Sequence, residues 1–236
     1  MNNSQNLLPG GFHQLTLLEK TLDKNFEKIL VIGESSEKIV TNLLVKYQSH
    51  IEYIVEDYES LLNAKLILGS DSQVIPKLMD FEKTDFQSNT FDLIFAQASL
   101  SRENRKEIIR EIKRILTHGG IFAIGEIVTL TQNPPRMIQD MLNWAGIVPL
   151  HINEIENYYK MKNFEIIAQK TFHKALPEYY RKIKTLFESK KDNLTEQEKS
   201  YYKKLINRIN HEANLFTKFG GEKHIVFHSI IAKNIN

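Results

Sequence analysis

Carboxylate and amide side chains stand near the ends of several short apolar runs in this chain. Asp57, Asp80, Gln97 and Glu126 each lie at or close to the last residue of such a run. These groups accept hydrogen bonds from the hydroxyl and amine groups of a small polar ligand. If the runs are neighbouring strands, the four side chains meet at one edge of a sheet.

The apolar runs have the length and composition of buried strands. The run 91–98 is too short for a typical helix and rich in Phe and Ile, which predicts a buried strand. Residues 108–128 then predict a helix with Ser101 as its N-cap, a turn at Gly119-Gly120 and a strand up to Glu126. Two such strands joined by a helix are normally parallel, and ligands bind beyond their carboxyl ends.

The remaining elements follow from the same criteria. Strands are predicted over residues 29–33, 51–55, 74–79, 91–98, 121–124, 164–168 and 224–232. Before the last of them, residues 177–188 predict an amphipathic helix, and Thr195 with Glu198 forms the capping box of a second helix.

The composition is that of an ordinary globular chain. With 236 residues, 25% charged and 42% hydrophobic, we expect one domain with an appendage. No apolar run approaches the roughly 20 residues of a membrane helix, and no secretory signal is visible, so we expect a cytoplasmic protein without a membrane partner. The absence of cysteine excludes disulfides and thiolate ligands. The eight His residues lack ligand spacing, so no metal site is predicted.

Charge is unevenly distributed. The net charge is +2, which gives no electrostatic argument for a nucleic-acid partner. From His173 onward the chain has 13 Lys and Arg against 7 Asp and Glu. Such a surface would attract an anionic substrate or partner, although a solvated lysine-rich helix face has the same pattern. Nothing in the pattern predicts an oligomeric state.

Residues 78–126 resemble part of a known family. The stretches DFEKTDFQSNTFDLI, from Asp80, and REIKRILTHGGIFAIGE, from Arg110, are similar to class I S-adenosylmethionine-dependent methyltransferases. In that family an acid follows strand 3, Phe-Asp opens strand 4, and a helix and Gly-Gly precede strand 5. The resemblance implies a Rossmann-like, doubly wound α/β fold with a seven-stranded, mostly parallel sheet and an antiparallel last strand.

On this resemblance the chain is a single methyltransferase-like domain with four parts. Residues 1–24 form an N-terminal cap, and residues 25–172 form the Rossmann-like core. Residues 173–222 form a helical-hairpin insertion between strands 6 and 7, which we expect to lie over the active site as a lid. Residues 223–236 form the last strand.

The resemblance also assigns cofactor-binding residues. It implies that Asp57, with Glu56 as the alternative, binds the ribose hydroxyls. It also implies that Asp80 and the backbone N–H of Phe81 bind the adenine. An acid after a strand is often a helix cap instead, so that alternative stays open for Asp57. The other positions implied for the cofactor are Gly33, Glu34, Ser35, Tyr58 and Gln97.

The loop after the first strand departs from the family pattern. Where the family has Asp-x-Gly-x-Gly-x-Gly, this chain has VIGESSE from Val31 to Glu37. Glycine permits a positive φ and close approach of a ligand, and another residue in the left-handed region costs roughly 1–2 kcal/mol. Ser35 or Ser36 could donate to the cofactor's carboxylate, and Glu34 or Glu37 could meet its ammonium group.

The resemblance implies transfer of a methyl group from S-adenosylmethionine to a small-molecule acceptor, with S-adenosylhomocysteine as product. A hydroxyl or protonated amine acceptor needs a base, for which His13, Glu126 and His151 are candidates; the catalytic residue is otherwise not predicted. The lost glycines favour an alternative, a non-catalytic pseudo-methyltransferase that acts as a binding or scaffold subunit. An RNA methyltransferase would use the basic C-terminal helices, but Ala96-Gln97-Ala98 lacks the motif expected after strand 4.

Overall fold

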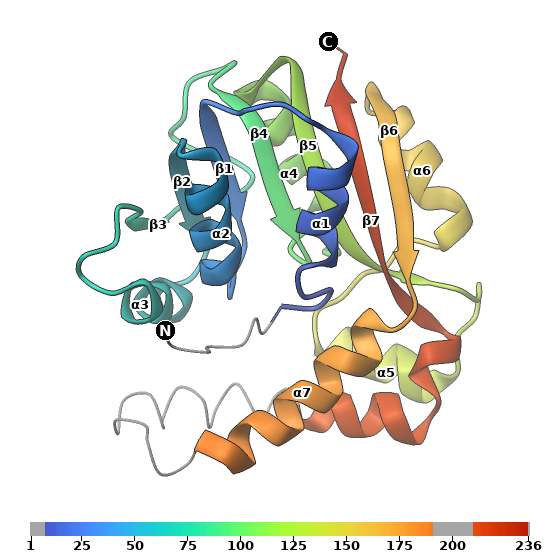
Figure 1. The fold of residues 1–236 in the computed structure, drawn as a ribbon. Coiled ribbons are helices and arrows are strands. Elements are labelled where there is room, and N and C mark those ends of the chain that lie inside the picture. Colours follow the sequence, from blue (N-terminus) through green and yellow to red (C-terminus); the bar gives the residue numbers. More distant parts are fainter. Residues whose placement is uncertain (1–7, 191–209, 236) are drawn as a thin grey trace.

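Seven strands form one sheet in the computed structural model, which describes residues 8–190 and 210–235. They are β1 (Lys28–Ile32), β2 (His50–Val55), β3 (Pro76–Leu78), β4 (Phe91–Gln97), β5 (Leu116–Thr129), β6 (Phe164–Phe172) and β7 (Ile225–Asn234). Their order is β3-β2-β1-β4-β5-β7-β6 (Figure 1). Strand β7 is antiparallel to both of its neighbours, whereas the other pairs are parallel. The predicted doubly wound α/β fold with an antiparallel last strand is confirmed.

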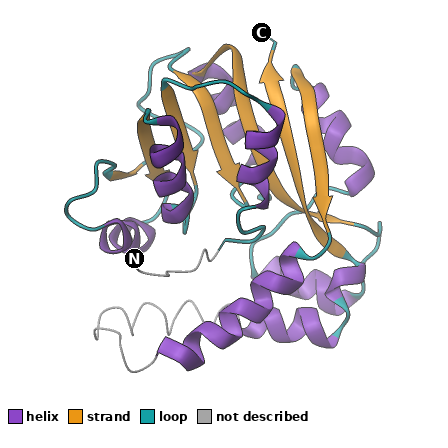
Figure 2. Ribbon diagram, in the orientation of Figure 1, coloured by secondary structure: helices purple, strands orange, loops and turns teal. Residues whose placement is uncertain are grey.

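Helices cover both faces of this sheet (Figure 2). One face carries α1 (His13–Thr21), α2 (Glu37–Tyr47) and α3 (Tyr58–Leu68), and the other carries α4 (Arg105–Ile115) and α6 (Ile152–Lys160). Beyond the carboxyl ends of the parallel strands lie α5 (Arg136–Trp144), α7 (Ala175–Lys190), the helical residues 210–218 and the short 3₁₀ helix Gly221–Lys223 (Figure 1). The second helix predicted for the insertion falls largely outside the described residues, so the hairpin and its role as a lid stay predictions.

The core explains why the strands are continuous apolar runs. Strand β4 is covered on both faces: Ile94 packs in the cluster under α4, while Leu93 and Phe95 pack in the cluster under α2. A strand buried on both sides needs apolar residues at successive positions. This is why the short runs could be recognised in the sequence.

Two predicted details around α4 are wrong. The helix begins at Arg105 after Asn104, and the Ser101 hydroxyl donates instead to the Glu126 carboxylate at 3.1 Å. The helix ends at Ile115 and β5 starts at the next residue, before Gly119-Gly120. The last carbonyls of α4 accept hydrogen bonds from the N–H groups of residues 89 and 90, so no glycine cap is required.

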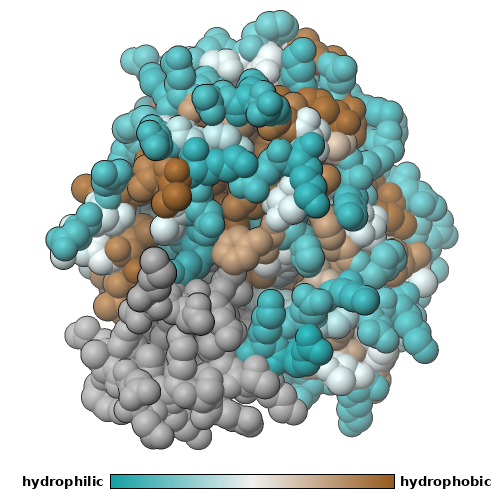
Figure 3. Space-filling view, viewed as in Figure 1, coloured by the Kyte–Doolittle hydropathy of each residue, from teal (hydrophilic) through white to brown (hydrophobic). Residues whose placement is uncertain are grey.

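The molecular surface over α1 and α2 is mostly hydrophilic, with exposed apolar residues in small separate groups (Figure 3). Such scattered residues are normal and do not mark a docking surface. Among the helices of the described ranges, none has the length and apolar character to cross a membrane.

Candidate functional site

A cavity of about 370 Å³ opens at the carboxyl ends of β1 and β4. Its walls come from residues before α1, the loops after β1 and β4, strand β5, the end of α5, α7 and the helical residues 210–218. Its polar and aromatic lining residues are Glu34, Ser35, Gln97, Ser99, Arg102, Trp144, Tyr179, Tyr180 and Glu212. This place in an α/β sheet, and a volume of this order, are typical of small-molecule sites.

The loop after β1 keeps a glycine-type backbone at two positions. Gly33 has φ +119°, and a Cβ atom there would lie 2.8 Å from the Cβ of Ser99. Ser35 also has a positive φ, 60°, although it is not a glycine. The Ser99 hydroxyl donates to the Ile32 carbonyl at 3.1 Å and so ties the loop after β4 to β1. The turn is therefore present although the sequence lacks the family's later glycines, and it carries Glu34 and Ser35 in the cavity wall.

Ser36 and Glu37 lie beneath this turn and not in the cavity. Both are buried. The Tyr53 hydroxyl donates to Glu37 at 3.2 Å and accepts from the Ser36 N–H at 3.3 Å. Burial raises the pKa of Glu37. Of the alternatives left open for the loop, Glu34 and Ser35 are the residues that reach the cavity.

Gln97 joins the N-terminal segment to the end of β4. Its Nε2 donates to the carbonyls of Pro9, at 2.7 Å, and Gly11, at 2.9 Å. Its Oε1 is buried and has no hydrogen-bond partner among the described residues. A buried amide oxygen without a partner is unfavourable, and Gln97 is a lining residue of the cavity.

The ends of β2 and β3 lie outside the cavity lining. Asp57 caps α3, because its carboxylate accepts from the Ser60 N–H at 2.8 Å and from the Ser60 hydroxyl at 2.6 Å. Tyr58 follows in the first turn of α3 and is 64% exposed. Asp80 is exposed and accepts from the Glu82 N–H at 2.8 Å. The structure thus brings Gly33, Glu34, Ser35 and Gln97 together. Asp57, Tyr58 and Asp80 lie apart from this group.

Glu56 occupies the end of β2, and both of its carboxylate oxygens have partners. The Phe81 N–H donates to Oε1 at 3.2 Å. The Arg102 guanidinium pairs with Oε2 and lies 5.6 Å from the centroid of the Phe81 ring. Arg102 also lines the cavity, so it connects the cavity to the acid at the end of β2.

Glu126, a predicted base candidate, is fully buried and does not line the cavity. Its carboxylate accepts from Ser101 and from Arg105, whose Nη2 lies at 2.9 Å, and also from the Tyr159 hydroxyl. Burial, followed by the charge of Glu126, raises the pKa of Tyr159 well above its usual value. The hydrogen bonds and the ion pair of Glu126 therefore connect α4 and α6 to β5.

The two histidine candidates also lie outside the cavity lining. The His13 ring stacks on Phe172 with ring centroids 4.8 Å apart. The His151 ring caps α6, where its Nδ1 accepts from the Asn153 N–H at 3.2 Å.

Sequence reasoning missed the aromatic and acidic end of the cavity. Tyr180 is 3% exposed, and its hydroxyl donates to Glu212 at 3.4 Å. Burial, and then the Glu212 charge, raises the Tyr180 pKa well above its usual value. The Trp144 ring, from α5, packs edge-on against the His211 ring, with ring centroids 4.9 Å apart. On the amphipathic helix α7, Tyr180 belongs both to a core cluster and to the cavity wall.

Comparisons with known proteins agree with this geometry. A family model described as a methyltransferase domain matches residues 76–214, more than half of the chain. The chain belongs to the methyltransferase-domain family. This methyltransferase is 25% identical, over 149 residues, to the sarcosine/dimethylglycine N-methyltransferase of Halorhodospira halochloris. The match covers 61% of this chain and 50% of that protein, so the chain spans about half of the relative's length.

Solved structures share the fold of this methyltransferase. Phosphoethanolamine N-methyltransferase 2 of Haemonchus contortus, in complex with S-adenosyl-L-methionine, matches with a TM-score of 0.75 at 13% identity, over 97% of this chain and 54% of that one. The geranyl diphosphate C-methyltransferase of Streptomyces coelicolor A3(2), in complex with S-adenosyl-L-homocysteine, matches with a TM-score of 0.69 at 11% identity, over 94% and 78% of the two chains.

Proposed function

We propose that this methyltransferase transfers the methyl group of S-adenosylmethionine to a small amine held in the cavity at the ends of β1 and β4. The observation that carries the proposal is the turn after β1. Gly33 and Ser35 both adopt positive φ there, so the backbone follows a glycine-type turn that places Glu34 and Ser35 in the cavity wall despite the missing glycines.

The residues around this turn suit the cofactor. Glu34 offers a carboxylate to an ammonium group, Ser35 a hydroxyl to a carboxylate, and Gln97 an amide oxygen that lacks a partner. At the end of β2 we favour Glu56 for the ribose hydroxyls, because the Asp57 carboxylate is already bound to the start of α3. Asp80 stays our proposal for the adenine amine. Arg102 must leave Glu56 for the ribose to bind.

The acceptor end of the cavity favours a cation. Trp144, Tyr179 and Tyr180 supply aromatic rings, and Glu212 supplies a buried carboxylate. Aromatic faces and carboxylates both attract ammonium groups. The printed names of the Halorhodospira and Haemonchus relatives, both N-methyltransferases, support the same class. We therefore propose an amine and not an anionic acceptor, which was one of the two interpretations of the basic C-terminal segment.

The chemistry then asks little of the chain beyond positioning. The cofactor, when bound, supplies an electrophilic methyl group together with its leaving group. The chain must hold the amine nitrogen in line with that methyl, which can contribute roughly 7–11 kcal/mol. An ammonium must first lose a proton, and Glu34 and Glu212 are the carboxylates of the lining that can accept it.

Calorimetry and a turnover assay test this proposal. We expect S-adenosylhomocysteine to bind, and Asp80→Ala to weaken it roughly tenfold or more, because a hydrogen bond to a charged group contributes about 1.5–3 kcal/mol. We expect release of S-adenosylhomocysteine from S-adenosylmethionine with sarcosine or ethanolamine but not with ethylene glycol. No binding of S-adenosylhomocysteine at millimolar concentration by the folded protein would favour the pseudo-methyltransferase. If S-adenosylhomocysteine binds but no amine supports turnover, the proposed acceptor class is wrong and the proposed cofactor site still stands.

A further inference from the structure

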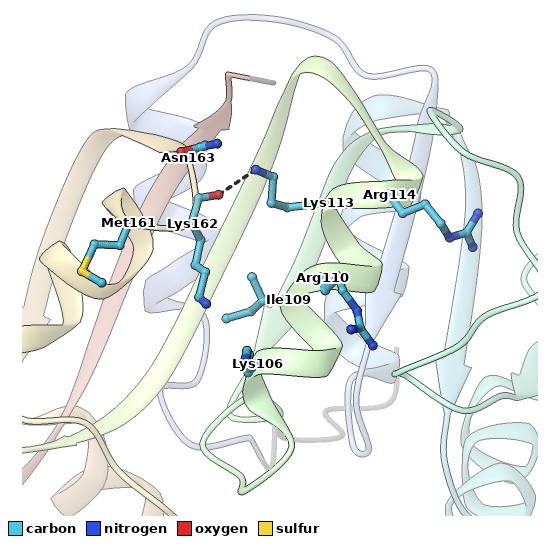
Figure 4. Close-up of a pocket in the computed structure, with 8 residues that line it drawn as sticks. All are labelled: Lys106, Ile109, Arg110, Lys113, Arg114, Met161, Lys162 and Asn163. Atoms are coloured by element: carbon cyan, nitrogen blue, oxygen red, sulfur yellow. Dashed lines mark hydrogen bonds between the residues drawn. The ribbon is translucent and has the colours of Figure 1, made fainter.

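A second cavity lies on the face of the sheet that carries α4 and α6, between α4 and the turn that joins α6 to β6 (Figure 4). Its volume is about 470 Å³. The cationic residues that line it, here called the basic groove, are Lys106, Arg110, Lys113, Arg114 and Lys162; no acidic residue lines it. Ile109 and Met161 add apolar surface. The basic groove shares no lining residue with the candidate active site.

Several of these charges lack a counter-charge. Arg114 pairs with Glu111 at 2.6 Å. Within the described ranges, neither Lys106 nor Arg110 forms an ion pair. Lys113 donates to the backbone carbonyl of Lys162 at 2.8 Å, which holds the opposite wall of the groove, with its own lysine, against α4 (Figure 4).

Helix formation alone does not account for this arrangement. Basic residues in the last turn of a helix are favourable, which explains Lys113 and Arg114, but Lys106 lies in the first turn, where a cation is unfavourable. Lys106 and Arg110 are four residues apart, and Arg110 and Lys113 are three apart. Like charges at these spacings are neighbours on one helix face and repel each other.

The repulsion extends across the groove to the opposite wall. Burial, and then the charge of Lys162, lowers the pKa of Lys113. An anion between α4 and Lys162 would relieve both the repulsion along α4 and the repulsion across the groove.

We propose that the basic groove binds a small phosphorylated anion, separately from methyl transfer. Cations from two elements line the groove, with Lys106, Lys113 and Lys162 around Ile109 (Figure 4), and its volume falls within the range of small-molecule sites. The Arg110 guanidinium can hold two phosphate oxygens at once, while Lys106, Lys113 and Lys162 contribute point charges. Ile109 and Met161 give the remainder of the ligand an apolar surface to lie on. A concave site of this size suits a small molecule better than a nucleic-acid backbone.

Calorimetry with sodium pyrophosphate on the full chain tests the proposal. We expect binding in the micromolar range, weakened by added salt because part of the attraction is screened. We expect Lys106→Gln/Arg110→Gln to weaken binding about tenfold or more. Both side chains are exposed, so this double variant should melt at the same temperature as the wild type or higher. Lys65→Gln, an exposed lysine on α3 across the sheet, is the matched control and should bind normally.

Three results would overturn the proposal. They are no binding of pyrophosphate at millimolar concentration, equal binding by the double variant, and an equal loss in Lys65→Gln. A short RNA duplex that binds more tightly than pyrophosphate and loses affinity in the double variant would assign the groove to nucleic acid instead. None of these results depends on whether the chain methylates an amine.

Discussion

Arg102 holds the acid at the end of β2, and its removal should tighten cofactor binding. In the structure its guanidinium pairs with Glu56 and lies over the Phe81 ring. The two charged side chains are 36% and 24% exposed. If the ribose hydroxyls bind Glu56, they must first displace Arg102. The Arg102–Glu56 pair therefore competes with the cofactor.

The size of the effect follows from the exposure of the pair. A solvent-exposed ion pair contributes about 0–1 kcal/mol, and an exposed cation–π contact adds about 0.5–1 kcal/mol. Displacing Arg102 therefore costs the cofactor about 1 kcal/mol, or roughly fivefold in affinity. Arg102→Gln should bind S-adenosylhomocysteine roughly fivefold more tightly than the wild type.

Titration calorimetry with S-adenosylhomocysteine measures this change. Arg110→Gln, which removes an exposed arginine outside the cavity, is the control and should leave the dissociation constant unchanged. Glu56→Gln should weaken binding about tenfold, because a charge-assisted hydrogen bond is lost. If Arg102→Gln instead weakens binding fivefold or more at an unchanged melting temperature, Arg102 is a cofactor ligand and the competition argument is wrong.

Three further predictions concern the loop, the core and pH. Gly33→Val should abolish S-adenosylhomocysteine binding because its side chain meets Ser99, while Ser35→Gly should raise the melting temperature, since it relieves roughly 1–2 kcal/mol of left-handed strain. Glu126→Ala should lower the free energy of unfolding by about 3–5 kcal/mol in urea titrations, because Arg105 is left buried without its partner. Burial lowers the pKa of His228 to about 4, so the unfolded chain binds this proton first and stability should fall by up to about 3 kcal/mol as pH drops from about 6.5 to about 4; His228→Gln should flatten that part of the profile.

Each of these predictions has a result that contradicts it. A tenfold loss of affinity in Ser35→Gly would show that the serine hydroxyl is a cofactor donor and that strain relief is secondary. A Glu126→Ala loss below about 1 kcal/mol would mean that water reaches Arg105. An unchanged acid slope in His228→Gln would assign that slope to other groups.

The sheet was predictable because burial on both faces forces apolar runs that the sequence displays directly. Phe91 to Gln97 was recognisable for that reason. The start of α4 was not, because Ser101, a good N-cap by type, is recruited by Glu126 from a strand 25 residues away in the sequence. A contact between residues this far apart in the sequence produces no local sequence pattern, so it cannot be predicted from one.

The same distinction separates the parts of the candidate site. Glu34, Ser35 and Gln97 were predictable because they follow strands whose ends must meet at one edge. Arg102 and Glu212 come from a loop and from the distant helical residues 210–218, and only the folded chain brings them to the cavity. The positive φ of Ser35 was equally hidden, since serine rarely adopts it.

The position of β7 in the sheet also bears on how the chain can fold during synthesis. This strand is made after all the others, yet it lies between β5 and β6 and pairs with both. While residues 225–234 are still inside the ribosome, β5 has an open edge and β6 has no neighbour in the sheet. At about 5–20 residues per second, the emerging chain carries these unpaired edges for seconds. Open edges pair readily with other chains. We therefore expect chaperones to shield the nascent polypeptide until β7 has been synthesised and can pair.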